Sequence, residues 1–93
     1  METYTETVLR YVVEYLEKLP PEHQAAMRIN GIDPDNNWCL KWSFNTEEDA
    51  NNQLRIEEEW YQKFCEEHGF TPSKKFRVRD LGETQYIERK VLF

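Results

Sequence analysis

The first residues of the chain carry apolar side chains at helical spacing. Val8, Tyr11, Val12 and Tyr15 recur at intervals of three and four, which predicts an amphipathic helix over about residues 6–18. Thr5 supplies an N-cap hydroxyl. Two consecutive prolines at positions 20 and 21 are expected to end this helix, because proline interrupts helical hydrogen bonding.

Alternation of apolar and polar residues then predicts two strands. Over residues 24–32, Met27 and Ile29 alternate with polar neighbours. The segment DPDNN (33–37) has the composition of a turn. The following stretch, WCLKWSF (38–44), places two tryptophans, a leucine and a phenylalanine on one face and gives the clearest strand pattern in the chain.

The second half of the chain predicts a long helix and a hairpin. Thr46 is the expected N-cap of a helix that runs to about His68, and Gly69 is its expected C-terminal stop. Residues 74–81 and 85–93 are then expected to pair as a hairpin around Leu-Gly-Glu-Thr (81–84).

The predicted order is α-β-β-α-β-β within a single domain over residues 1–93. A shift of 49 residues aligns the two halves in phase, which favours two pseudo-repeated α-β-β units, about 4–44 and 46–93. Such units predict an α+β fold with one four-stranded antiparallel sheet and both helices on one face, the content of a permuted ferredoxin-like sandwich.

Composition narrows the classes of function. The chain has 93 residues, a formal net charge of -6 and thirteen aromatic residues, three Trp, five Tyr and five Phe. No apolar run is long enough to span a membrane, and the N-terminus lacks the pattern of a signal peptide, so a cytoplasmic protein is expected. Two cysteines do not make a disulfide framework. No catalytic, cofactor-binding or metal-binding motif is present, so we predict no catalytic residue, no cofactor and no metal, and a protein that is not an enzyme.

Positive charge is concentrated at the end of this acidic chain. Residues 74–93 hold six of the twelve lysines and arginines. Strand alternation predicts that three of these cations, Arg77, Arg79 and Lys90, share the open face of the sheet with Arg28, Lys41 and Tyr86. This basic face is either a device that keeps an exposed sheet soluble or a docking surface for phosphate, as in nucleic acid, or for an acidic protein.

Acidic residues are concentrated on the long helix. Its outer side is expected to present Glu48, Glu58, Glu59 and Glu66, either as a solvated surface or as an imitation of a phosphate row that occupies a basic groove on a partner protein. Glu57 is expected inside the apolar stripe of the same helix. There its carboxylate either lies at the edge of the stripe, finds a partner such as an arginine or a tyrosine hydroxyl, or takes up a proton.

The expected first helix carries a second apolar row, formed by Leu9, Val13 and Leu16. A helix that packs on one sheet needs one apolar stripe, so the second row is either a set of three tolerated surface residues or a contact with a target or a homodimer partner.

Together these features predict a non-enzymatic, acidic protein-binding module. The expected role is that of an inhibitor, an immunity protein or an antagonist, such as a phage-encoded or mobile-element accessory protein that acts against host defence. Its expected partner is a protein with a basic surface, such as one that binds nucleic acid, and no membrane partner is expected. The alternative is a nucleic-acid-binding regulator that uses the basic face of the sheet.

Overall fold

The computed structural model describes residues 2–91. They form two helices and five strands, and the strands make up two antiparallel sheets. The α+β class is therefore confirmed. In chain order the elements are β1 (Thr3–Val8), β2 (Tyr11–Glu17), α1 (Pro21–Ile29), β3 (Cys39–Phe44), α2 (Glu47–His68), β4 (Lys74–Asp80) and β5 (Gln85–Lys90). The end of the last expected strand, residues 92 and 93, lies outside the described residues.

The expected helix over residues 6–18 is wrong, because this segment forms β1 and β2. Between residues 3 and 17, nine of fifteen residues are threonine, valine or tyrosine. Branched and aromatic side chains lose rotamer freedom in a helix and fit a pleated sheet well. Here that preference prevails over the helical spacing of the apolar positions.

The expected strand over residues 24–32 is also wrong, because α1 occupies most of it. Pro21 stands in the first turn of α1, where a missing N–H costs nothing and the fixed φ angle suits the helix. The two prolines therefore start a helix instead of ending one. Residues 4–44 consequently follow the order strand, strand, helix, strand.

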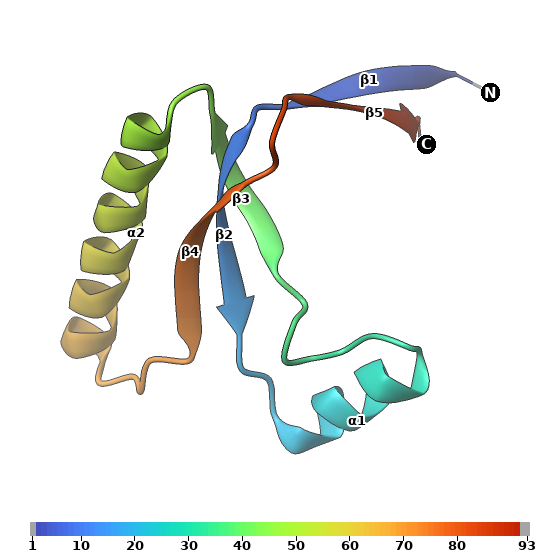
Figure 1. Cartoon of the computed structure of the whole chain (residues 1–93). Helices are drawn as coiled ribbons and strands as arrows, with labels where there is room; N and C mark the ends of the chain where they lie inside the picture. Colours follow the sequence, from blue (N-terminus) through green and yellow to red (C-terminus); the bar gives the residue numbers. More distant parts are fainter. Residues whose placement is uncertain (1, 92–93) are drawn as a thin grey trace.

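The strands β4 and β5 exist as expected, but they do not pair with each other. β4 pairs with β2 and β5 pairs with β1, so the two chain ends form one long antiparallel ribbon in two segments (Figure 1). Residues 81–84 do not turn the chain back. Gly82 has a φ of 86°, and its N–H donates to Asp80 Oδ1 at 2.8 Å, which gives an irregular step between the two segments.

The main body consists of a three-stranded sheet, order β3-β2-β4, covered on one face by α2 (Figure 1). Val13 of β2 and Ala50 of α2 are completely buried, and Tyr61 of α2 meets Phe76 of β4 edge to face at 5.6 Å. By contrast, α1 lies beyond the end of the sheet (Figure 1). The expected single four-stranded sheet with both helices on one face is therefore replaced by two sheets and one covering helix.

Two segments extend from this body. The β1–β5 pair projects at one end and α1 at the other (Figure 1). The Cα radius of gyration is accordingly 15.9 Å, whereas a compact domain of 100 residues has about 13 Å. A large share of the chain is thus available for contact with other molecules.

Candidate protein-binding surface

Helix α2 is defined at both ends by local sequence. Thr46 is its N-cap, and the hydroxyl oxygen accepts a hydrogen bond from the Asp49 N–H at 3.2 Å. Gly69 ends the helix in the left-handed conformation with a φ of 67°. Three acids occupy the first turn, where carboxylates interact favourably with the helix dipole. Both expected ends are confirmed.

Helix α2 contains as much net charge as the whole chain. It has eight acidic and two basic residues, which gives -6, the same value as the full sequence. At 100° per residue, Glu48, Glu59 and Glu66 lie within about 20° of one another on the outer side of the helix, and we call them the acidic row. All three are exposed, as is Glu58, which is turned roughly 80–100° away from them. The four predicted acids are therefore a row of three and one separate residue.

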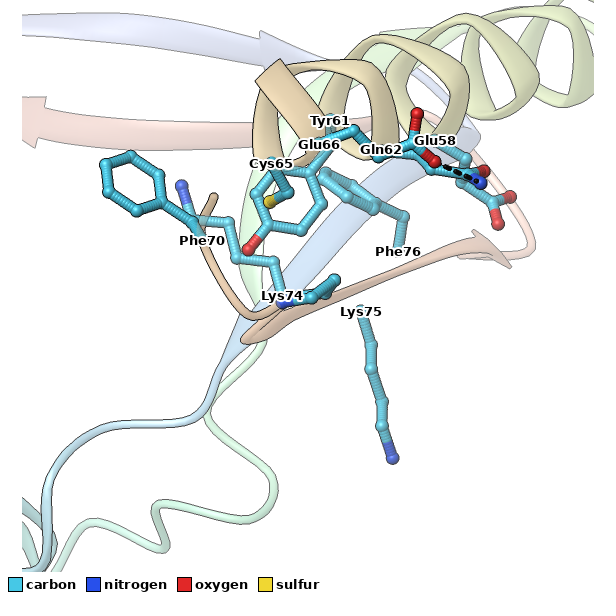
Figure 2. Close-up of a pocket in the computed structure, with 10 residues that line it drawn as sticks. Glu58, Tyr61, Gln62, Cys65, Glu66, Phe70, Lys74, Lys75 and Phe76 are labelled. Carbon is cyan, nitrogen blue, oxygen red and sulfur yellow. Dashed lines mark hydrogen bonds between the residues drawn. The ribbon is translucent and has the colours of Figure 1, made fainter. Parts of the chain in front are cut away.

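Glu58 belongs to a groove between α2 and β4 (Figure 2). The groove has a volume of about 650 Å³, and Cys65 and Phe76 contribute to its apolar lining. Lys74 reaches toward the helix, with Nζ 5.8 Å from the centre of the Tyr61 ring. Lys75 extends away from the helix (Figure 2). The carboxylate of Glu58 therefore faces a different surface from the carboxylates of the acidic row.

Glu57 is buried between α2 and β3, with 7% of its surface exposed. Its carboxylate accepts hydrogen bonds from Lys41 Nζ at 2.6 Å, Trp42 Nε1 at 2.7 Å and Gln53 Nε2 at 3.1 Å. Burial opposes ionisation, but these hydrogen bonds outweigh it and lower the pKa of Glu57 below its usual value. Of the three alternatives for this carboxylate, the one with a partner is confirmed, with a lysine, an indole and an amide in place of an arginine or tyrosine.

An irregularity in β3 makes the Glu57 contacts possible. The register between β2 and β3 shifts after the Val13–Trp42 pair, so that Glu14 pairs with Leu40 and Lys41 is the extra residue. Lys41 and Trp42 can then both reach the helix. The predicted placement of Lys41 on the open face is consequently wrong.

Exposed apolar side chains lie close to Glu57 on α2 and β3. Ile56 and Trp60, four residues apart on α2, are 53% and 60% exposed, and Trp42 on β3 is 46% exposed. We call these three residues the aromatic patch, after its two tryptophans. Trp60 stacks on Phe64 with ring centres 5.3 Å apart, and Trp42 is fixed by its bond to Glu57, so both indoles are held in place. The patch adjoins the acidic row on the same helix.

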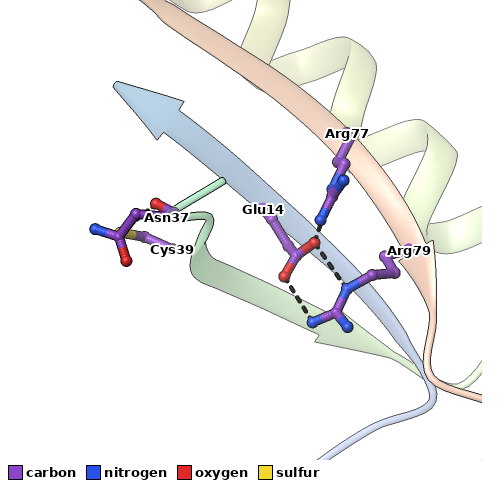
Figure 3. A network of polar contacts seen from close by, with 5 residues as sticks. All are labelled: Glu14, Asn37, Cys39, Arg77 and Arg79. Atoms are coloured by element: carbon purple, nitrogen blue, oxygen red, sulfur yellow. Dashed lines mark hydrogen bonds and ion pairs between the residues drawn. The ribbon is translucent and has the colours of Figure 1, made fainter. Parts of the chain in front are cut away.

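A second ionic cluster occupies the sheet face opposite α2 (Figure 3). Glu14 on β2 is 2% exposed and lies between two arginines of β4. Its carboxylate accepts bonds from Arg77 Nε at 3.0 Å and from Arg79 Nε and Nη2 at 3.0 and 2.9 Å. Burial opposes ionisation of Glu14, but both guanidinium groups lower its pKa below the usual value. The Arg77 guanidinium also lies 4.0 Å from the centre of the Trp38 ring.

The predicted basic face is divided among separate parts of the molecule. Arg77 and Arg79 share one face but are bound to Glu14, and Lys41 is bound to Glu57. Arg28 lies on α1, and Tyr86 and Lys90 lie on β5 in the other sheet. These residues do not form one continuous surface.

The predicted contact row of Leu9, Val13 and Leu16 is not a surface either. Val13 is completely buried beneath α2, whereas Leu9 and Leu16 are half-buried. Strand alternation places Val13 and Leu16 on opposite faces of β2. Sequence reasoning missed Glu14. The signal would have been its position among the tyrosines and valines of a strand, together with the arginines elsewhere in the chain.

Among residues 2–91, no cluster of three or more His, Cys, Asp or Glu side chains is arranged to hold a metal ion. In the same range, neither helix is both long and apolar enough to cross a bilayer. Comparison of the chain with protein-family models, with curated proteins and with solved structures finds no match. Function is therefore inferred from the geometry.

Proposed function

We propose that this protein is a non-enzymatic binding module that docks through α2 onto a basic surface of a partner protein. The observation that carries the proposal is the aromatic patch of Ile56, Trp60 and Trp42, each about half exposed, beside a helix with a net charge of -6. Exposed tryptophans cost solubility and are enriched among the residues that dominate binding energy at protein interfaces.

The aromatic patch and the acidic row would contribute to binding in different ways. Trp42 and Trp60 are held in place before binding, so little side-chain entropy is lost when they insert into a partner. The acidic row supplies long-range attraction to a basic surface, which raises the association rate and excludes acidic competitors.

The acidic row carries negative charge as a nucleic acid does, but its charges are spaced much more widely than phosphates. Glu48 and Glu59 are separated by roughly 16 Å along the helix, and Glu59 and Glu66 by roughly 10 Å. Duplex DNA carries one charge per roughly 1.7 Å, so the carboxylates cannot replace phosphates one for one. Occupation of a basic surface would still block its normal ligand, which is the action we propose for a cytoplasmic inhibitor, immunity protein or phage-encoded antagonist.

The alternative of a nucleic-acid-binding regulator receives less support. Arg77 and Arg79 share the carboxylate of Glu14, and Tyr86 and Lys90 lie on a different sheet. Nucleic-acid platforms combine a continuous basic groove with stacking aromatics, and neither is assembled around these residues.

Charge reversal tests the proposal. The triple variant Glu48→Lys, Glu59→Lys and Glu66→Lys should lose binding to the partner captured from native lysate, and residual binding should no longer weaken as salt rises. Glu88→Lys, an exposed change on β5, is the single-site control and should bind as the unaltered chain does. Full, salt-sensitive binding by the triple variant would refute the role of the acidic row.

A further inference from the structure

The β1–β5 sheet is an isolated arm. Its strands pair with each other over six residues, from Thr3 opposite Lys90 to Val8 opposite Gln85, and of these residues only Val8 is buried. No other described element has more than marginal contact with it. A two-stranded sheet alone is marginally stable in water, so a further strand would stabilise this arm substantially.

The outer edge of β1 is suited to accept such a strand. The Val91 N–H donates to the Glu2 carbonyl at 3.0 Å, which fixes the alternation of hydrogen bonds along the ladder. In this phase the N–H and C=O groups of Thr3, Thr5 and Thr7 point away from β5. No strand of residues 2–91 covers that edge. It also contains no proline or lysine, the residues that commonly protect sheet edges.

The sequence of β1 is complementary to itself. An antiparallel pair of β1 strands related by a two-fold axis at Thr5 places Thr5 opposite Thr5, Thr3 opposite Thr7 and Tyr4 opposite Glu6 of the other copy. No like charges face each other. Glu6 is already neutralised by Arg89 of its own arm, whose Nε lies 2.8 Å from Glu6 Oε2.

The outer edge of β5 is much less suited to the same arrangement. There the outward groups belong to Tyr86, Glu88 and Lys90, so the full-length two-fold pairing centres on Glu88. Two copies would then place Glu88 directly opposite Glu88, and like charges in that position are destabilising. The charge pattern therefore selects β1 over β5.

We propose that two copies of this chain associate through β1, with the two-fold axis at Thr5. The arms then join into one four-stranded antiparallel sheet of order β5-β1-β1-β5, closed by about six new backbone hydrogen bonds. The dimer contact is independent of α2, so each copy keeps its acidic row and aromatic patch free. It also replaces the contact predicted through Leu9, Val13 and Leu16.

Paired proline variants test the proposal. Thr5→Pro removes an outward N–H of β1, and Tyr86→Pro removes an outward N–H of β5, while both leave the bonds within the arm in place. Sedimentation over a concentration series should give the unaltered chain and Tyr86→Pro about twice the 11.3 kDa chain mass. The dimer dissociation constant should rise at least about tenfold for Thr5→Pro. A monomeric unaltered chain at millimolar concentration, or loss of dimer with Tyr86→Pro alone, would overturn it.

A cysteine variant gives an independent readout if Thr5→Pro unfolds the arm. In the proposed dimer the two Thr5 Cα atoms are about 5.5 Å apart, within the range that a disulfide spans. Mild oxidation of Thr5→Cys should give a cross-linked dimer on a non-reducing gel, whereas Glu88→Cys and the unaltered chain should remain monomeric on that gel. Equal cross-linking of Thr5→Cys and Glu88→Cys would show that the arms do not meet at Thr5.

Discussion

Replacement of Glu14 by glutamine should destabilise the protein markedly. The carboxylate is 2% exposed and accepts three hydrogen bonds, at 2.9–3.0 Å, from Arg77 and Arg79. The substitution keeps the shape, but it removes the charge and turns one acceptor into a donor that faces a guanidinium. Breaking a fully buried ion pair costs about 3–5 kcal/mol.

The two arginines reduce this cost because their side chains are 39% and 51% exposed and can be rehydrated. We therefore expect a loss of about 2 kcal/mol for Glu14→Gln. For a domain of this size each kcal/mol shifts the melting temperature by about 4–8 °C, so the midpoint should fall by roughly 8–16 °C. Thermal and urea unfolding followed by circular dichroism measure both quantities.

The matched control is Glu88→Gln, which removes one negative charge at an exposed position on β5. Its free energy of unfolding should change by no more than about 0.5 kcal/mol. If Glu14→Gln unfolds at the same temperature as Glu88→Gln, the network around Glu14 contributes nothing to stability and the reasoning is wrong.

Acid titration adds a second signature for Glu14. Its pKa is lowered in the folded protein, so its stabilising contribution is present above the pKa of the unfolded chain and is lost as pH falls through the lowered folded value. The stability difference between the unaltered chain and Glu14→Gln should be constant near neutral pH and should shrink below about pH 5. A difference that does not change with pH would show that the carboxylate charge is not its source.

Two further predictions concern other carboxylates. Glu57→Gln should cost about 1–2 kcal/mol in urea unfolding, because Lys41 and Trp42 lose a charged acceptor but Lys41 can turn to solvent; unchanged stability would contradict the importance of this contact. The Asp80 carboxyl, bound by Arg10 and by the Gly82 N–H, has its pKa lowered to about 2. An NMR titration should show this value in the unaltered chain and a rise toward the ordinary aspartate value in Arg10→Ala, and an equal midpoint in both would contradict the assigned cause.

The elements of the second half of the chain are predictable because the signals for α2, β4 and β5 are local, although the pairing of the two strands is not. Thr46 and Gly69 define α2 by capping, and the apolar stripe of the helix faces the sheet as the helical period requires. Glu57 could be identified as a buried carboxylate from that period alone. Its partner Lys41 could not, because the register shift in β3 depends on how three strands fit together.

In the first half of the chain two signals conflict. The spacing of Val8, Tyr11, Val12 and Tyr15 suits a helix, while the side-chain types suit a strand, and pairing with β3 and β4 on either side decides for the strand. The pairing of β5 with β1 was equally hidden, since the residues involved are more than seventy positions apart. Local turn signals at residues 81–84 favoured a hairpin that does not form.

The most direct test of the proposed binding surface compares two exposed aromatics at separate places. Trp60 on α2 is 60% exposed and Tyr86 on the arm is 73% exposed, so neither Trp60→Ala nor Tyr86→Ala disturbs a buried core. We would measure recovery of partner proteins from nuclease-treated native lysate by both variants and by the unaltered chain. The account predicts that one or more proteins are lost with Trp60→Ala and retained with Tyr86→Ala. Equal recovery by both variants, or loss only with Tyr86→Ala, would contradict it.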